Sequence, residues 1–162
     1  MLRNFVLFIA ITLFSSVLTA QQSIPNITLK TVNGIKVQSN EVLNEDGFTI
    51  ISFWATWCIP CINELDAIND LYPSWKDKDI NVLAISTDDA RSKKRVRPLV
   101  SGKNWVFEIY SDTNQEFKRA LNVGGIPHTI IAYGSKIIYR RIGYSPGEEK
   151  DLFNVISNYK QN

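Results

Sequence analysis

Two long apolar runs dominate the pattern of the chain, and both have the length of a buried strand. Residues 48–55 and 80–86 are nearly continuous in β-branched, aliphatic and aromatic side chains, which is typical of strands covered on both faces. Between them, residues 60 to about 75 have the pattern of a helix. Two buried strands joined by a helix predict a parallel βαβ unit.

A hairpin is predicted on each side of this unit. Residues 27–38 alternate polar and apolar positions around Asn33-Gly34, a dipeptide favoured in tight hairpin turns. Residues 128–140 form two strand-like runs around Gly134-Ser135 and are interpreted in the same way. The chain therefore has paired strands both before and after its central unit.

The rest of the chain predicts shorter elements. A helix is expected after Asp88 and Asp89, whose carboxylates suit a helix N-terminus, although Pro98 compromises it. The other expected elements are a strand at 106–110, a helix at 113–121 and an amphipathic helix at 147–159. This order predicts an α/β fold in which helices flank a mixed central sheet, with an N-terminal β-hairpin extension.

The first twenty residues differ from the rest of the chain. Arg3 precedes an uncharged stretch at residues 5–18, and Ala20 offers a small residue at a candidate cleavage site. These features predict a secretory signal peptide at 1–20, with an uncleaved N-terminal anchor as the alternative. A helix over 5–18 would reach only about 21 Å, less than a hydrocarbon core of about 30 Å, which favours cleavage. In either case the domain at 21–162 is expected outside the cytoplasm, in the periplasm or on the outer face of the cytoplasmic membrane.

Composition excludes several classes of protein. The chain has 18 basic and 16 acidic residues, a formal charge of +2, whereas a dedicated nucleic-acid binder should be strongly basic. Its two cysteines exclude a multiply disulfide-bonded mini-protein. With a single histidine, they also cannot complete a four-ligand structural zinc site without carboxylates. The cysteines are therefore the first place to look for chemistry.

Cys58 and Cys61 stand where the first buried strand ends and the following helix begins. A helix N-terminus stabilises a thiolate there, so Cys58 is expected to be exposed and ionised, and Cys61 to be enclosed and protonated for longer. The three-residue spacing places both sulfurs on one side, close enough to bridge. Pro60 suits an early helix position, which needs no N–H donor. A redox-active pair is favoured over a structural disulfide, which would close too short a loop, and over a metal-binding pair.

The segment at 53–61, Phe-Trp-Ala-Thr-Trp-Cys-Ile-Pro-Cys, resembles the active site of thioredoxin-like thiol-disulfide oxidoreductases of the TlpA/ResA family. A second family mark is Gly-Gly-Ile-Pro at 124–127, just before a predicted strand. The resemblance extends over residues 24–160 and implies a thioredoxin fold for the domain.

The resemblance also implies a substrate site around the cysteines. Pro127 is expected to be cis and to face the pair, so that the carbonyl of Ile126 is presented to an extended substrate. Trp57 and Pro60 are expected to flank the nucleophile on the substrate side.

Glu64 is the candidate for proton transfer. Thioredoxins proper carry a buried Asp six residues before the first cysteine, but this chain has Ser52 there. Helical periodicity places Glu64 on the apolar side, one turn beyond Cys61, and the family pattern also has a Glu at this position. Burial would favour the protonated carboxyl and let it exchange protons near neutrality. The alternative is a side chain that reaches solvent from the edge of the apolar stripe. Asp66, where the family often has Pro, is expected to face solvent.

Two further features have alternative interpretations. His128 follows Pro127 where many relatives have Thr; it is either a solvated histidine or an imidazolium near Cys58 that stabilises the thiolate. The second feature is a run of five basic residues, interpreted as a solvated face or as a contact with an acidic partner or lipid headgroups: Arg91, Lys93, Lys94, Arg95 and Arg97.

Together these features predict an extracytoplasmic thiol-disulfide oxidoreductase in which Cys58 attacks a disulfide, Cys61 resolves the mixed disulfide and Glu64 moves the proton. The Cys58–Cys61 disulfide would be the redox group, with no organic cofactor or metal. The resemblance implies reduction of client proteins, as in cytochrome c maturation, and re-reduction by a membrane thiol-disulfide electron carrier. No nucleic acid partner is expected, and membrane contact only through an uncleaved N-terminal segment.

Three alternatives remain. The same cysteine chemistry could run in the other direction, as in an oxidase or isomerase. Two thiolates could hold Cu(I) in a thioredoxin-like binding module, although no Met lies near the pair and His128 is the one nearby imidazole. A peroxiredoxin is disfavoured, because it needs Pro and Thr seven and three residues before its reactive Cys, where this chain has Ile51 and Ala55.

Overall fold

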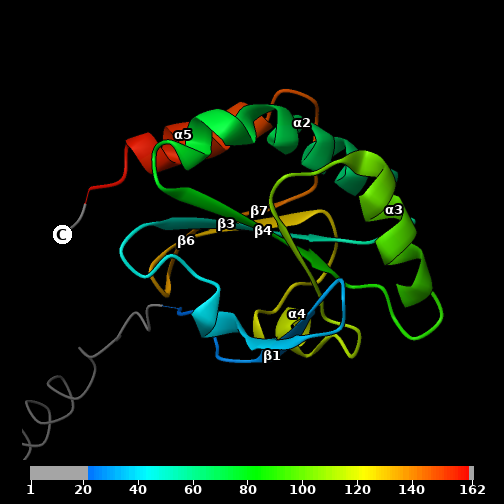
Figure 1. The fold of residues 1–162 in the computed structure, drawn as a ribbon. Helices are drawn as coiled ribbons and strands as arrows, with labels where there is room; N and C mark the ends of the chain where they lie inside the picture. The colour runs from blue at the N-terminus through cyan, green and yellow to red at the C-terminus, as the bar shows by residue number, and fades with distance from the viewer. Residues whose placement is uncertain (1–21, 161–162) are drawn as a thin grey trace, which may run out of the picture.

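The two long apolar runs of the sequence are neighbouring strands at the centre of one sheet (Figure 1). The computed structural model describes residues 22–160; the predicted signal or anchor segment lies outside them. The sheet has the strand order β2-β1-β5-β4-β3-β6-β7. Its strands are β1 (Thr28–Thr31), β2 (Lys36–Gln38), β3 (Phe48–Trp54), β4 (Ile80–Ser86), β5 (Glu108–Ser111), β6 (His128–Tyr133) and β7 (Lys136–Ile142).

The sheet is mixed, as the sequence predicts. Strand β3 is parallel to β4 and antiparallel to β6, and β5 is parallel to β4. The two predicted hairpins pair β1 with β2 and β6 with β7. The N-terminal hairpin extends the sheet through β1, which runs antiparallel to β5.

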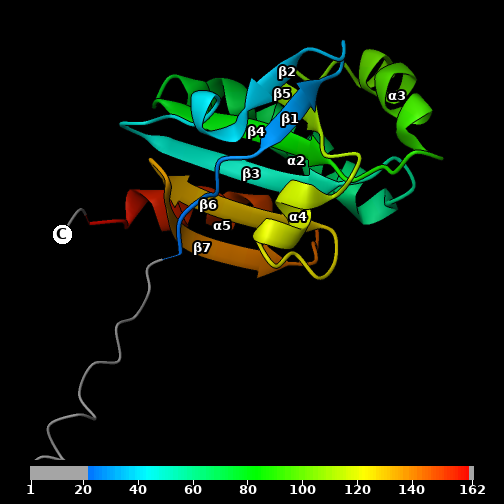
Figure 2. The same ribbon diagram turned by 90° about the horizontal axis from the view of Figure 1, so that it is seen from below.

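Helices cover both faces of the sheet (Figures 1 and 2). They are α2 (Ile59–Lys76), α3 (Val96–Lys103), α4 (Glu116–Ala120) and α5 (Glu149–Ser157), with short 3-10 turns at Ser39–Glu41 and Lys93–Arg95. Helices α2 and α5 lie on one face and α4 on the other. Among the described residues, none of these helices combines the length and the apolar character that crossing a bilayer would require.

Strand β3 contributes alternate residues to two separate cores, because successive side chains of a strand point to opposite faces. Ile50 and Trp54 belong to the core beneath α2 and α5, whereas Ile51 and Phe53 belong to the core beneath α4. All four are fully buried. The register thus directs Ser52, between them, toward α2, and leads the chain from β3 straight into the cysteine loop.

The elements whose bounds differ from the predictions include α3, β5 and α4. The helix expected after Asp88 and Asp89 begins only at Val96, after the 3-10 turn, and Pro98 lies in its first turn, where no N–H is needed. Strand β5 begins at Glu108 and not at 106, because the N–H of Val106 donates instead to the Asn69 side chain, at 2.9 Å. Helix α4 is shorter than expected, and covers only Glu116–Ala120.

Candidate active site

Cys58 and Cys61 form a disulfide at the start of α2. Their Cα atoms are 5.3 Å apart, and Cys58 is the N-cap residue. The N–H of Cys58 donates to the carbonyl of Ala55 (3.0 Å), and its carbonyl accepts from the N–H of Ile62 (3.1 Å). Pro60 occupies the first turn and is exposed. The predicted bridge between the two sulfurs is therefore present.

The expected exposure of Cys58 is wrong. Its residue is 6% exposed and that of Cys61 is 0% exposed, and both belong to the core beneath α2. The residues on either side of Cys58 are exposed instead: Trp57 is 62% and Ile59 is 71% exposed. The bridge turns the Cys58 sulfur inward, so the surface around it is aromatic and aliphatic. The predicted order of accessibility, Cys58 before Cys61, is kept.

The peptide bond between Ile126 and Pro127 is cis, as expected. It directly precedes β6, whose first residue pairs with Phe53 near the end of β3. Pro127 thus lies at the edge of the sheet from which the cysteine loop emerges. The Pro127 carbonyl accepts from Gly143 (2.8 Å), whereas the carbonyl of Ile126 accepts no hydrogen bond within residues 22–160. Ile126 therefore has a carbonyl available to an extended chain.

Glu64 is fully buried, which excludes the alternative in which its side chain reaches solvent. Three groups donate to its carboxylate: Ser52 Oγ to Oε2 (3.1 Å), Thr129 Oγ1 to Oε1 (2.7 Å) and Arg141 Nη2 to Oε1 (2.8 Å). The side chain of Arg141 is itself only 12% exposed. A buried carboxylate is costly unless it is paired and hydrogen-bonded, and Glu64 is both.

The three donors come from three adjacent strands. Ser52 of β3 pairs with Thr129 of β6, and Thr129 pairs with Arg141 of β7. They form one row across the sheet beneath α2, and Glu64 points from the helix onto this row. The guanidinium and the two hydroxyls all donate, so each oxygen of the carboxylate accepts at least one hydrogen bond.

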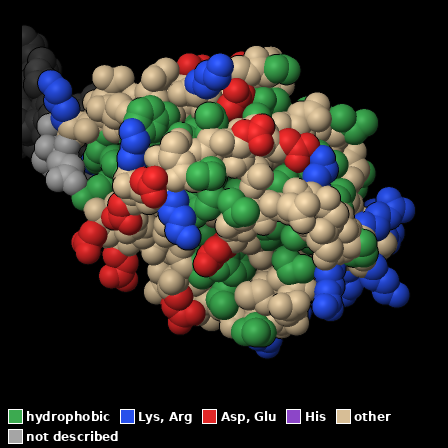
Figure 3. All heavy atoms as spheres, turned by 45° about the horizontal axis from the view of Figure 1, so that its top comes forward, with side chains coloured by type: hydrophobic (Ala, Val, Ile, Leu, Met, Phe, Trp, Pro, Cys, Tyr) green, Lys and Arg blue, Asp and Glu red, His purple; other side chains and the backbone are tan. Residues whose placement is uncertain are grey.

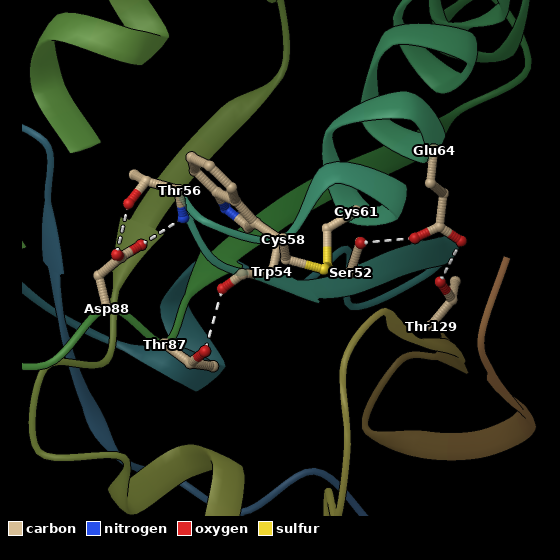
Figure 4. The surroundings of a disulfide bond; sticks show 9 residues. All are labelled: Ser52, Trp54, Thr56, Cys58, Cys61, Glu64, Thr87, Asp88 and Thr129. Carbon is tan, nitrogen blue, oxygen red and sulfur yellow. Dashed lines mark hydrogen bonds between the residues drawn. A yellow bond between two sulfur atoms is a disulfide. The ribbon is translucent and has the colours of Figure 1, made fainter. Parts of the chain in front are cut away.

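Figure 4 shows Ser52 between the disulfide and the carboxylate of Glu64. Ser52 stands where thioredoxins proper carry Asp, and it is fully buried. Its hydroxyl donates to a carboxylate that α2 supplies. Glu64 thus places a buried carboxylate on the same side of the sheet as Ser52, next to the position where thioredoxins proper carry Asp.

A second buried carboxylate, Asp88, fixes the segment before the cysteines (Figure 4). Asp88 is 1% exposed and accepts from the Thr56 N–H (2.8 Å), the Thr56 hydroxyl (2.7 Å) and the Ser86 hydroxyl (2.9 Å). The N–H of Thr87 donates to the carbonyl of Trp54 (2.8 Å). Asp88 therefore positions the cysteine loop. It does not begin a helix, so the helix N-terminus predicted at Asp88 and Asp89 is wrong. The sequence does contain a signal for this role: parallel strands β3 and β4 end side by side, so the residues that follow each strand, Thr56 and Asp88, lie close together.

His128 fits neither of its two interpretations. It is 3% exposed, so it is not a solvated histidine. Burial, and then the nearby charge of Arg140, lower the pKa of His128, which favours the neutral ring over an imidazolium. Both ring nitrogens are buried without a hydrogen-bond partner within the described residues. The ring meets Phe53 edge to face, with centroids 6.5 Å apart.

Other predicted positions have structural roles. Asp66 accepts from Lys103 Nζ (2.5 Å) and from Trp105 Nε1 (2.9 Å), and so links α2 to the C-terminal end of α3 and to the residues that follow it. Trp75 and Trp105 are buried and pack in the core beneath α2 and α5. Within residues 22–160, no group of three or more His, Cys, Asp or Glu is arranged to hold a metal ion.

Comparison with known proteins identifies relatives with this organisation. Residues 20–141 match the family model described as the AhpC/TSA family. The thiol-disulfide oxidoreductase ResA of Bacillus thuringiensis (strain Al Hakam) is 27% identical over 126 residues, which are 77% of this chain and 70% of that protein.

Two solved structures have the same fold. An uncharacterized thioredoxin-like protein from Porphyromonas gingivalis is 36% identical, with a TM-score of 0.71 and coverage of 85% of this chain and 94% of that one. A putative thiol:disulfide interchange protein DsbE from Chlorobium tepidum is 20% identical, with a TM-score of 0.75 and the same coverage. The fold is therefore thioredoxin-like, as predicted.

Proposed function

The chain belongs to the AhpC/TSA family, within which it is a TlpA/ResA-like thiol-disulfide oxidoreductase, and we propose that it reduces disulfide bonds of client proteins outside the cytoplasm. One observation carries the proposal: the Cys58–Cys61 bridge stands at the N-terminus of α2. The helix N-terminus favours a thiolate at Cys58, and thiolates are the attacking species in disulfide exchange.

The proposed cycle begins from the dithiol form. The Cys58 thiolate attacks one sulfur of a client disulfide; a mixed disulfide forms and the other client sulfur leaves as a thiolate. Cys61 then loses its proton and attacks the Cys58 sulfur, which releases the second client thiolate and forms the Cys58–Cys61 disulfide. Two electrons pass to the client, and a thiol donor must return them. No organic cofactor or metal takes part in this cycle.

Glu64 is proposed to take the proton that Cys61 releases. It is buried on the same helix one turn beyond Cys61, and its carboxylate is held by Ser52, Thr129 and Arg141. A carboxyl group buried this close to the pair is a candidate general base for the thiol proton. The Ser52 hydroxyl lies on the disulfide side of this carboxylate (Figure 4).

The client is proposed to lie across Trp57, Pro60 and the Ile126–Pro127 turn. Trp57 and Pro60 are exposed beside the disulfide, and the Ile126 carbonyl is available as an acceptor. An extended client segment would pair its backbone N–H with that carbonyl, as in strand addition.

Location, direction and partners also belong to the proposal. The resemblance supports a signal peptide or anchor at 1–20, clients of the cytochrome c maturation type, and a membrane thiol-disulfide carrier as the electron donor. The midpoint potential of the Cys58–Cys61 couple separates a reductant from an oxidase or isomerase, because potential decides the direction of exchange.

The deciding experiment compares the reduced wild type with Cys58→Ser and Cys61→Ser in an insulin-reduction assay. Wild type should reduce insulin, Cys58→Ser should be inactive, and Cys61→Ser should accumulate a mixed disulfide visible on a non-reducing gel. If both variants retain wild-type activity, the mechanism is wrong.

Titration with Cu(I) tests the binding-module alternative, which requires tight stoichiometric binding without insulin reduction. A peroxide assay tests the peroxiredoxin alternative, which Ile51 and Ala55 disfavour.

A further inference from the structure

A pocket of about 360 Å³ opens beside the disulfide. Its wall includes Trp57, which directly precedes Cys58 and is 62% exposed. The pocket is lined by Trp57, Thr87, Asp89, Arg91, Ser92 and Gln115. A client segment held at Cys58 therefore has a polar pocket with one aromatic wall next to it, on the side of the chain that follows β4.

Arg91, which lines this pocket, is the first residue of a strongly cationic segment. We call Arg91, Lys93, Lys94, Arg95 and Arg97 the basic segment; all five are exposed. Lys and Arg side chains gather at the lower right of Figure 3, the side on which α3 lies in Figure 1. The segment covers the 3-10 turn Lys93–Arg95 and the first residues of α3.

The charges of this segment are largely unneutralised. Arg91 pairs with Asp89 through Nε (3.0 Å) and Nη2 (2.9 Å). Within residues 22–160, none of the other four members of the basic segment forms an ion pair. Four neighbouring cations without a carboxylate repel one another and create a local positive potential. The potential is local, because the whole chain has a formal charge of only +2.

From this placement we propose that the Trp57 pocket and the basic segment together bind an acidic, extended segment of a client protein. The inference rests on the proposed function, because it assigns the client chemistry that the same disulfide would select. The residues flanking the client cysteine would contact Trp57 and exposed Ile59, and carboxylates further along the client would pair with Lys93, Lys94 and Arg95. Complementary charge raises the association rate and selects among partners.

An anionic membrane surface is the competing occupant of the basic segment. It is disfavoured by position, because Arg91 and Ser92 line the same pocket as Trp57. A bilayer held against this face would cover the approach to Cys58, which the proposed cycle needs open to clients.

The test uses three disulfide-containing peptides that differ only in the residues flanking the cysteine: four acidic, four neutral or four basic. The reduced protein should show a kcat/KM for the acidic peptide at least about tenfold above that for the neutral one at low salt. High salt should remove this preference, because screening acts on exposed charges. The basic peptide should be the poorest substrate.

A variant with Lys93→Gln, Lys94→Gln and Arg95→Gln should lose most of the preference for the acidic peptide. The matched control carries Lys76→Gln, Lys150→Gln and Lys160→Gln, which are also exposed and remove the same charge elsewhere; it should keep the preference. Equal kcat/KM for the three peptides at low salt, or a preference that survives in the triple variant, would overturn the proposal.

Two further measurements distinguish a failure of the acidic-client proposal from a failure of the proposed disulfide reduction. Binding of an acidic peptide with Ser in place of Cys reports docking even if no disulfide is reduced. Turnover of the neutral bis(2-hydroxyethyl) disulfide reports the cysteine chemistry without charge. If vesicles rich in anionic lipid bind the wild type and not the triple variant, while the Ser peptide shows no charge preference, the membrane replaces the client and the proposal is wrong.

Discussion

Arg141 Nη2 lies 2.8 Å from Glu64 Oε1, and the pair is buried beneath α2, where the Glu64 side chain has no exposure. The two partners are 77 residues apart in the sequence, and Ser52 and Thr129 complete the carboxylate's hydrogen bonds. The cysteine helix is thus attached to the far edge of the sheet through the group proposed to manage the Cys61 proton. The same contact is therefore expected to affect both the stability of the protein and the proposed proton transfer.

Replacing Arg141 by Met should destabilise the protein by about 3–5 kcal/mol at neutral pH, because Glu64 would be left as a buried charge without its cation. Urea denaturation of the wild type, Arg141→Met, Glu64→Gln and the double variant forms the cycle that measures the coupling. A loss in the double variant equal to the sum of the two single losses would mean that Glu64 and Arg141 do not stabilise each other.

Replacing Glu64 by Gln should slow the resolution of the mixed disulfide by about 100-fold or more at neutral pH, if Glu64 is the proton acceptor. The rate should recover as the pH rises, because hydroxide and buffer can then take the Cys61 proton. Stopped-flow measurement of client release across pH checks this. The matched control is Asp70→Asn, which removes an exposed carboxylate from the same helix. A pH profile identical to that of the control would reduce Glu64 to a packing residue.

The position of Glu64 could be predicted, whereas that of Arg141 could not. A helix has a fixed period, so counting from Cys61 places Glu64 on the buried side. The approach of Arg141 depends on strand register. A hairpin without irregularity, paired as Tyr133 with Lys136, would set Arg140 opposite Thr129. The register shifts between Ile131 and Ala132, however, and Arg141 takes that place.

This one-residue shift decides which face each arginine occupies, because neighbouring side chains of a strand point to opposite faces. Arg141 turns to Glu64, and Arg140 instead donates to the carbonyl of Leu121 on the other side.

The core strands, by contrast, were predictable from their apolar runs alone. The burial of Cys58 was missed because the sequence shows that a cysteine begins a helix, but not which way its sulfur turns.

Replacing Asp88 by Ala should lower the free energy of unfolding by about 1–3 kcal/mol, since the Thr56 N–H would lose its buried acceptor. The loop that carries Trp57 should also loosen, so kcat/KM for insulin should fall more than that for a small disulfide. Asp70→Ala is the control; it removes an exposed carboxylate from α2, and it should leave stability and kcat/KM for insulin nearly unchanged. Equal losses in the two variants would show that Asp88 has no special role.

His128 should make stability depend on pH in a window that begins near its unfolded pKa of about 6.5. Burial and the charge of Arg140 lower the pKa of His128 in the folded protein, so the unfolded chain binds more protons just below that pH. Stability should therefore be fully present above about pH 6.5 and be lost as the pH falls toward the folded pKa.

The contribution can be isolated, because His128 is the single histidine of the chain. Phe is the replacement of choice: the ring is buried against Phe53, and neither nitrogen has a partner to lose among the described residues. The melting temperature of each protein is measured between about pH 7.5 and about pH 5, a range that includes the titration of histidine. Over this range the melting temperature of His128→Phe should fall less than that of the wild type. Carboxylates common to both proteins cancel in the difference. Parallel curves for the two proteins would mean that the folded imidazole accepts its proton as readily as the unfolded one, and that the site is open to water in solution.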